Sequence, residues 1–282
     1  MSGSTSMADR PLSPRWRPAA LIKASVAVHA VGAGVLLARP HLWPWVLGGV
    51  LADHLVLTAA GLWPRSRLLG PNWTRLPAPA DPSEPGRIAI TIDDGPDPQI
   101  TPQVLAQLEV HKAHATFFCV GARIEQYPQL AREIIARGHG IENHTFHHPM
   151  TFSLLGPKRM ASEILRTQDI IASTTGQVAQ FFRAPAGLRN PLLERELVKA
   201  RLRLVSWTRR GFDTVNNDPA TVLGRLTRGL SAGDIVLLHD GHAARTAGGS
   251  AVILEVLPAL LQRLAARSLQ AVTLQSAFAA AA

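Results

Sequence analysis

The chain has 282 residues, which is enough for one large catalytic domain and a small appendage but not for two full enzymatic domains. Its 29 Lys and Arg against 20 Asp and Glu give a net charge of +9, an excess that suits nucleic acid, an anionic membrane surface or a phosphorylated substrate. The arginines are scattered, Tyr occurs once and zinc-finger and RNA-binding motifs are absent, so we expect no nucleic-acid partner, and the single cysteine excludes a disulfide framework within the chain.

Two apolar segments occupy the N-terminal part of the chain. Residues 1–17 are polar and basic, which predicts a short disordered head. Residues 19–38 and 42–63 are apolar, and each is near the roughly 20 residues that cross a bilayer. An Arg-Pro pair between them favours a tight turn, so we predict a transmembrane helical hairpin over residues 18–64. A cleavable signal peptide is the alternative, but HAVGAGVLLARP is a poor cleavage region with a second apolar segment directly behind it.

Ionisable residues interrupt both apolar segments. The first contains Lys23 and His29, and the second contains Asp53 and His54. Counted from the turn, His29 and Asp53 fall at a similar depth on the two antiparallel spans. Ionisable groups inside a membrane are costly and usually find partners. We therefore expect His29 and Asp53 to form a structural pair, with a functional site as the second interpretation.

Cationic residues gather at the outer ends of the predicted hairpin. The turn offers one arginine, whereas six lie beyond the two outer ends, namely Arg10, Arg15, Arg17, Arg65, Arg67 and Arg75. The positive-inside bias puts both ends in the cytoplasm and the protein in the inner membrane, with a periplasmic orientation as the alternative. Residues 65–86 are expected to form a Pro-rich linker. A catalytic domain is expected over residues 87–276.

From residue 87 onward, short apolar runs alternate with longer amphipathic ones, which predicts alternating strands and helices. The expected strands are residues 88–92, 115–120, 140–143, 180–183, 202–207, 234–239 and 270–274. The expected helices are residues 101–110, 127–137, 158–174, 191–200, 219–230 and 251–267. This alternation predicts an α/β fold with a parallel sheet, closed as a barrel or doubly wound. Ligands bind beyond the carboxyl ends of such strands.

Two of the expected strands end in residues of the kind that bind metals. ITIDDGPDP places Asp93 and Asp94 at the end of the first strand, although Asp, Gly and Pro also form turns without any function. ENHTFHHP gives His144 and His148 a spacing of four, which on a helical turn aims both imidazoles at one point. His147 lies one residue off that face and is left out. One carboxylate and two imidazoles make the shell of a first-row metal with open positions for water and substrate.

Three further polar residues follow later strands at the same expected edge. Arg183 lies in FFRAPAG, Asp213 in SWTRRGFD and His239 in DIVLLHDG. Each is a weak signal alone, because an arginine there is usually a surface charge and a histidine is often a satisfied core residue. Five polar clusters at one edge of a parallel sheet together indicate an active site.

The segments TIDDGPDP, ATFFCVGARIEQYP and GHGIENHTFHHP, in this order and spacing, resemble the polysaccharide deacetylase family, also called the NodB-homology domain or carbohydrate esterase family four. The likeness covers residues 87–274. It implies a distorted (β/α) barrel that holds a divalent metal through Asp94, His144 and His148. Zinc is the expected metal, with cobalt, nickel and manganese as the other candidates.

The resemblance also assigns roles to the remaining polar residues. Asp93 matches the family's base, and Arg183 matches the residue that orients this base. Asp213 pairs with the same region. His239 matches the general acid, and Leu237 matches a residue that lines the pocket for the acetyl methyl group.

The implied reaction removes N-acetyl groups from amino sugars of a glycan or of a lipid-linked saccharide by metal-activated water. The oxyanion is expected to rest on the metal and on the backbone N–H of Ala186. The family usually carries an aromatic residue at Ala186 and a Trp at Thr214, so two aromatic walls that stack on sugar rings are missing, which disfavours a long chitin-like polymer. The alternatives are an O-acetyl esterase or a deformylase with the same site, and an inactive membrane-anchored carbohydrate-binding domain.

Overall fold

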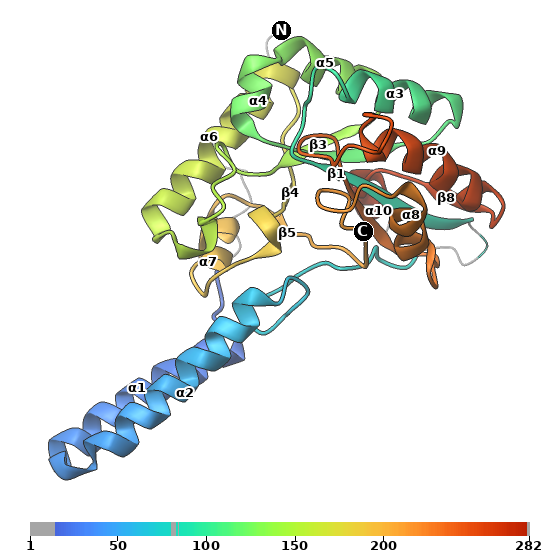
Figure 1. Ribbon diagram of the computed structural model, residues 1–282. Coiled ribbons are helices and arrows are strands. Elements are labelled where there is room, and N and C mark those ends of the chain that lie inside the picture. The colour runs from blue at the N-terminus through green and yellow to red at the C-terminus, as the bar shows by residue number, and fades with distance from the viewer. Residues whose placement is uncertain (1–14, 80–82, 84, 281–282) are drawn as a thin grey trace, which may run out of the picture.

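Two apolar helices project from a catalytic domain that surrounds a parallel sheet (Figure 1). The structure is a computed structural model that describes residues 15–79, 83 and 85–280. Of the expected basic head, residues 1–14 lie outside this described part.

The N-terminal hairpin consists of α1 (Ala20–Ala38), the 3₁₀ turn η2 (Pro40–Leu42) and α2 (Trp43–Leu62). Both predicted apolar helices are therefore confirmed, and each is long and apolar enough to cross a membrane. They pack closely where Gly32 faces Val46, since a side chain at Gly32 would meet the Val46 methyl group at 2.9 Å. Most of their apolar surface remains exposed, as expected of helices that lie in lipid.

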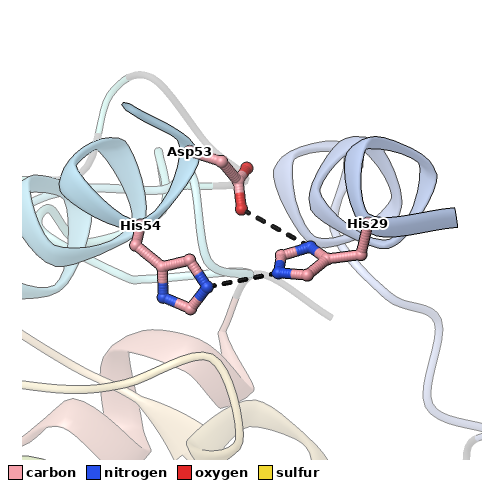
Figure 2. Close-up of side chains that lie close together, drawn as sticks. All are labelled: His29, Asp53 and His54. Atoms are coloured by element: carbon pink, nitrogen blue, oxygen red, sulfur yellow. Dashed lines mark hydrogen bonds and ion pairs between the residues drawn. The ribbon is translucent and has the colours of Figure 1, made fainter. Parts of the chain in front are cut away.

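His29 of α1 lies close to Asp53 and His54 of α2 (Figure 2). His29 Nδ1 lies 3.9 Å from Asp53 Oδ2 and 2.8 Å from the Ser25 carbonyl oxygen. The Ser25 hydroxyl donates to Asp53 Oδ2 at 2.7 Å, and the Nε2 atoms of His29 and His54 are 3.3 Å apart. The predicted pair of His29 and Asp53 is present, and it belongs to a network that links the two helices.

The catalytic domain is built on parallel strands in the order β5-β4-β3-β2-β1-β7-β6, with β8 paired to one end of β1. The strands are β1 (Gly86–Asp93), β2 (Ala115–Cys119), β3 (Gly140–Asn143), β4 (Phe181–Phe182), β5 (Arg203–Leu204), β6 (Arg209–Arg210), β7 (Ile235–His239) and β8 (Leu269–Ala271). Each of the seven expected strands is confirmed, although several are shorter than predicted, and β6 was not predicted. Within the described residues, β5 and β6 at the two ends of this order are not paired, so the barrel is open on that side.

Most helices of this domain cover the outside of the sheet, and the last of them contributes side chains to the inside of the barrel (Figure 1). They are α3 (Thr101–Val110), α4 (Gly121–Gln126), α5 (Pro128–Ala136), α6 (Pro157–Thr175), α7 (Leu193–Lys199), α8 (Pro219–Thr227), α9 (Val252–Ala265) and α10 (Leu274–Ala279). Each of the six expected helices is confirmed. The sequence did not predict α4, which is only 6 residues long, or α10, whose first residue was assigned to the last strand.

Alternate residues of β1 serve the two faces of the sheet. Ile88, Ile90 and Ile92 are fully buried against the outer helices. Ala89 belongs to a second cluster inside the barrel, together with side chains from β2, β4, β7 and α10. Side chains alternate along the strand, so Asp93 points to the same inner face as Ala89. The strand that builds the core therefore also presents this carboxylate inside the open end of the barrel.

The segment that follows α2 attaches the hairpin to the catalytic domain. The Arg189 amide donates to the Gly61 carbonyl at 3.2 Å, and the Ser206 hydroxyl donates to the Pro64 carbonyl at 2.6 Å. The Arg189 guanidinium also donates to the Ser66 carbonyl at 2.5 Å. We call residues 61–66 the joint, because these bonds hold the end of α2 directly on the domain.

Residues 73–76 continue from the joint and lie within the expected Pro-rich linker. Trp73 forms a parallel bridge with Val205, and Arg75 forms an antiparallel bridge with Asp234. The first bridge lies directly after β5, and the second lies at the residue that precedes β7, the neighbour of β6. The first half of the expected linker therefore packs on the barrel instead of spanning free space.

Candidate metal centre and active site

The carboxyl ends of adjacent strands bring the polar residues together. Asp93 is the last residue of β1, and its register partner on β7 is His239. His144 follows the end of β3, and Arg183 follows the end of β4. Because all of these strands are parallel, the sheet collects the four side chains at one end, as the sequence predicts.

Asp94, His144 and His148 form a compact group of metal-ligand type. Asp94 Oδ1 lies 3.2 Å from His144 Nε2 and 3.2 Å from His148 Nε2. The two histidines do not lie on a helical turn, contrary to the prediction from their spacing. They lie in the loop after β3, where Thr145 (φ 65°) and His148 (φ 52°) adopt left-handed backbone conformations that turn both rings toward Asp94.

The donor set fits a divalent ion. Two ligands about 2.0–2.2 Å from a tetrahedral zinc lie about 3.3–3.6 Å apart, close to the 3.2 Å spacing found here. Asp94 Oδ1 is buried and has no hydrogen-bond partner within the described residues, and such an atom requires an explanation. His144 Nδ1 lies 2.8 Å from the Arg183 carbonyl oxygen, so it donates there and leaves the Nε2 lone pair directed at Asp94.

Protonation states also suit metal binding, which requires neutral imidazoles and an ionised carboxylate. Burial lowers the pKa of His148 to about 4, with a further contribution from His144. Burial alone would raise the pKa of Asp94, but the neighbouring imidazoles of His144 and His242 hold it well below its usual value. At neutral pH, therefore, Asp94 is ionised and His148 is neutral.

Asp93 is held by a buried arginine. Arg183 Nη1 donates to Asp93 Oδ1 at 2.6 Å and to the Thr91 hydroxyl at 2.8 Å. Its other nitrogens donate to backbone carbonyl groups after β5, and its guanidinium lies over the Phe118 ring at 4.1 Å. This fixed cation orients Asp93 and leaves Asp93 Oδ2 without a guanidinium contact.

His239 is held by Asp213, which lies beyond β6. Asp213 Oδ1 accepts a hydrogen bond from His239 Nδ1 at 2.9 Å, and Asp213 Oδ2 accepts one from the His239 amide at 2.7 Å. Burial alone would lower the pKa of His239, but the charge and hydrogen bond of Asp213 raise it to about 9. His239 is therefore protonated at neutral pH, with Nε2–H free of Asp213.

These groups open into a cavity of about 660 Å³. Ala186 (φ 54°) and Leu237, both expected near the substrate, line this cleft, and so does Thr214, where the usual aromatic is missing. Left-handed residues other than glycine are uncommon and gather at functional sites. Here Asp94, Thr145, His148, Ala186 and His242 all have positive φ angles.

Several cleft residues were not selected from the sequence, with His242, Trp207 and Arg210 among them. His242 Nδ1 lies 3.3 Å from Asp94 Oδ2, and its position three residues after His239 at a strand end was the available signal. Trp207 and Arg210 also line the cleft, yet both appeared to be ordinary strand-end residues. His147, which was left out of the metal group, lies 2.8 Å from Glu163 Oε1.

Comparisons with known proteins agree with this geometry. Residues 80–205 match the family model described as polysaccharide deacetylase. A peptidoglycan-N-acetylglucosamine deacetylase of Bacillus cereus is 35% identical over 175 residues, which cover 61% of this chain and 81% of the relative. A chitooligosaccharide deacetylase of Bradyrhizobium is 34% identical, over 55% of this chain and 71% of the relative. The solved structure of a family 4 carbohydrate esterase from Streptomyces lividans in complex with acetate superposes with a TM-score of 0.60 at 32% identity, covering 66% of this chain and 91% of that one.

Proposed function

Because the chain belongs to the polysaccharide deacetylase family, we propose that it is a metal-dependent hydrolase that removes N-acetyl groups from amino sugars of a glycan or a lipid-linked saccharide. The observation that carries this function is the position of Asp94 Oδ1, buried without a hydrogen-bond partner within the described residues and 3.2 Å from two imidazole Nε2 atoms. Relatives named for peptidoglycan and for chitooligosaccharides support an acetylated amino sugar as the substrate class.

We propose that Asp94, His144 and His148 hold the metal and that the metal is zinc. A nitrogen-rich set of two imidazoles and one carboxylate is typical of catalytic zinc sites, with cobalt, nickel or manganese as substitutes. When bound, such an ion polarises the substrate carbonyl and acidifies a water molecule. The remaining chemistry belongs to side chains of the cleft.

Asp93 is the proposed base. Arg183 engages Asp93 Oδ1 at 2.6 Å, so Oδ2 is the oxygen that takes a proton from the attacking water. This geometry fixes the orientation of Asp93, and Arg183 is its positioning residue.

His239 is the proposed acid. With Nδ1 bound to Asp213, His239 donates the proton on Nε2 to the amide nitrogen as the carbon–nitrogen bond breaks. The products are acetate and a free amine, and protonation spares the nitrogen from leaving as an anion. Asp213 holds the ring in place and keeps its pKa high, so Asp213 is a positioning residue.

The cleft walls complete the proposed site. The backbone N–H of Ala186 is available to the oxyanion that forms on the acetyl group. Leu237 is 1% exposed and lines the cleft, which suits it to contact the acetyl methyl group. Thr214 leaves the opposite rim without an aromatic platform for a long polymer.

The proposed organisation is a membrane hairpin over residues 18–64, a linker over 65–86 and a deacetylase domain over 87–276. Arg15, Arg17, Arg65 and Arg67 at the outer ends of the hairpin favour a cytoplasmic active site beside the inner membrane. Fusions of a periplasm-specific and a cytoplasm-specific reporter to the C-terminus test this orientation. Activity of the periplasmic reporter would overturn it.

Acetate release tests the proposed function. The full-length protein, treated with a chelator and then supplied with zinc, is assayed on N-acetylchitotriose, on the same sugar with O-acetyl groups, and on a formamido sugar. We expect acetate from N-acetyl groups, lost with the chelator and restored by zinc. Release from O-acetyl groups alone would assign the protein as an esterase, formate release alone would assign it as a deformylase, and no release from any substrate would support a binding domain.

A further inference from the structure

Arg210 is a cation of the cleft that has no acidic partner among the described residues. It lies on β6, beside Leu237 in the register with β7, and its side chain lines the cleft. Its Nε atom is buried and has no hydrogen-bond partner within the described part of the chain. Its guanidinium lies 5.3 Å from the Trp207 ring centre and 4.8 Å from that of Phe212. The neighbouring Arg209 turns away and bonds to Asp234 at 2.8 Å.

The other cationic and imidazole groups that line the cleft each lie within 4 Å of a carboxylate. Arg123 faces Asp97, and His147 faces Glu163. His144, His148 and His242 face Asp94, and His239 faces Asp213. A guanidinium is always charged and binds phosphate oxygens well because its N–H groups form a planar fork. Arg210 is therefore the side chain of this cleft best suited to receive an anion from the substrate.

A continuous set of contacts connects Arg210 to the end of the membrane hairpin. A side chain built at Gly187 would lie 2.6 Å from the Trp207 ring and 2.7 Å from Pro64. Pro64 is two residues beyond the end of α2 and is bonded to the domain through Ser206. The wall of the cleft that carries Arg210 is thus the wall that rests on the joint.

The joint lies at the level where a membrane would end. Trp63 is 61% exposed, and Arg65, Arg67 and Leu68 beside it are also exposed. Aromatic and basic residues of this kind sit at the membrane–water interface and anchor a span there. Phe212, whose ring lies 4.8 Å from the Arg210 guanidinium, is an exposed apolar residue as well.

We propose that Arg210 binds a phosphate that links the N-acetylated amino sugar to a membrane lipid, so that the substrate enters the cleft from the bilayer surface. This inference rests on the proposed function and narrows its substrate to a lipid-phosphate-linked saccharide. Arg210 holds the phosphate on the membrane side of the cleft, while the acetyl group reaches the metal site. A phosphate near a guanidinium is also found in nucleotide-linked sugars, but the joint and the exposed side chains of Trp63, Leu68 and Phe212 favour the lipid.

The test compares a lipid-linked, a nucleotide-linked and a phosphate-free N-acetylated amino sugar. Full-length protein in liposomes is assayed for acetate release from N-acetylglucosamine linked by diphosphate to a polyprenyl lipid, from the corresponding uridine diphosphate sugar, and from N-acetylchitotriose. We expect the highest kcat/KM with the lipid-linked sugar. Arg210→Gln should lower the ratio of kcat/KM for the lipid-linked sugar to that for N-acetylchitotriose by roughly tenfold to a hundredfold. Arg210→Lys should retain part of this preference.

Arg225→Gln is the matched control. Arg225 also lies over Phe212, at 5.5 Å, but it is exposed and does not line the cleft, so its loss should leave the ratio unchanged. An Arg210→Gln variant that loses activity equally on all three substrates would overturn the proposal and assign Arg210 a structural role. A higher kcat/KM for the nucleotide-linked sugar would overturn the choice of lipid. Absence of acetate release from every substrate would instead contradict the proposed function itself.

Discussion

Two charged pairs in the cleft divide the proton transfers between them. Arg183 Nη1 donates to Asp93 Oδ1 at 2.6 Å, whereas Asp213 accepts from His239 Nδ1 at 2.9 Å and raises the pKa of His239. The first pair orients a carboxylate that can accept a proton, and the second holds an imidazolium that can donate one, as base and acid catalysis in one site requires. The metal ligands are separate from both pairs, so binding of the metal and proton transfer should respond to different substitutions.

Replacement of His239 and of His144 should distinguish these two roles. His239→Ala removes the acid but leaves the metal ligands, so we expect full metal content and a turnover lowered by about 10²–10⁴-fold. His144→Ala removes a ligand, so we expect loss of both metal and activity. Metal analysis of the purified proteins beside an acetate-release assay checks this. A His239→Ala protein that loses its metal would place His239 in the metal shell.

Asp213→Asn should shift the pH dependence of the reaction. Asp213 raises the pKa of His239, and an acid catalyst must be protonated, so activity falls as pH rises through that pKa. Without the carboxylate the pKa is lower, and the alkaline limb of the kcat/KM profile should move to lower pH. An alkaline limb that stays in place in the variant would argue that another group is the acid.

At the scale of elements, the sequence predicted the ends of β1, β2, β3, β4 and β7 to within one residue, but it predicted loop geometry poorly. Continuous apolar runs such as 88–92 identify buried parallel strands, and the polar residues after them fall at one edge whatever the loops do. The convergence of His144 and His148 depends instead on left-handed backbone at Thr145, which side-chain periodicity does not reveal. The 6-residue helix α4 was missed because it is too short to show an amphipathic pattern.

Asp53 should stabilise the association of the two hairpin helices. Asp53→Leu removes the acceptor of the Ser25 hydroxyl and the carboxylate near His29, so we expect weaker association by about 1 kcal/mol. Disulfide cross-linking between cysteines introduced at Gly32 and Val46 measures this in membranes.

Two further variants make this test specific. Asp53→Asn keeps an acceptor for Ser25 and should retain most of the cross-linking. Thr58→Leu changes an exposed residue of the same helix and should have no effect. Equal cross-linking in the Asp53→Leu protein would show that the polar network does not hold the helices together.

At the scale of the whole molecule, the hairpin and the cleft form one connected unit. The joint bonds to the backbone beside Ala186 and Gly187, which are themselves cleft residues. The expectation of a spacer between membrane and enzyme came from the prolines of residues 65–86. Composition alone does not reveal that the first part of this segment packs on the barrel, because those contacts are made to residues more than 100 positions away.

Gly187→Ala should disturb the joint. Gly187 has φ 74° and no room for a side chain between Trp207 and Pro64, whereas Gly176 has φ 72° and open space around it. Both substitutions carry the same backbone strain, so the difference between them isolates the steric contact. We expect Gly187→Ala to destabilise the protein by about 1–3 kcal/mol more than Gly176→Ala in thermal unfolding. Equal losses of stability in the two variants would mean that the joint accommodates the added methyl group at no cost in free energy.

The most direct measurement of the central claim is acetate release by the full-length Asp93→Asn protein, with its metal content determined in the same sample. This substitution keeps the size of the side chain but removes its ability to accept a proton, and it leaves the three metal ligands untouched. We expect a full complement of metal and a loss of acetate release from N-acetylated amino sugars of at least about a hundredfold. Unchanged acetate release would contradict the hydrolytic mechanism proposed for this site.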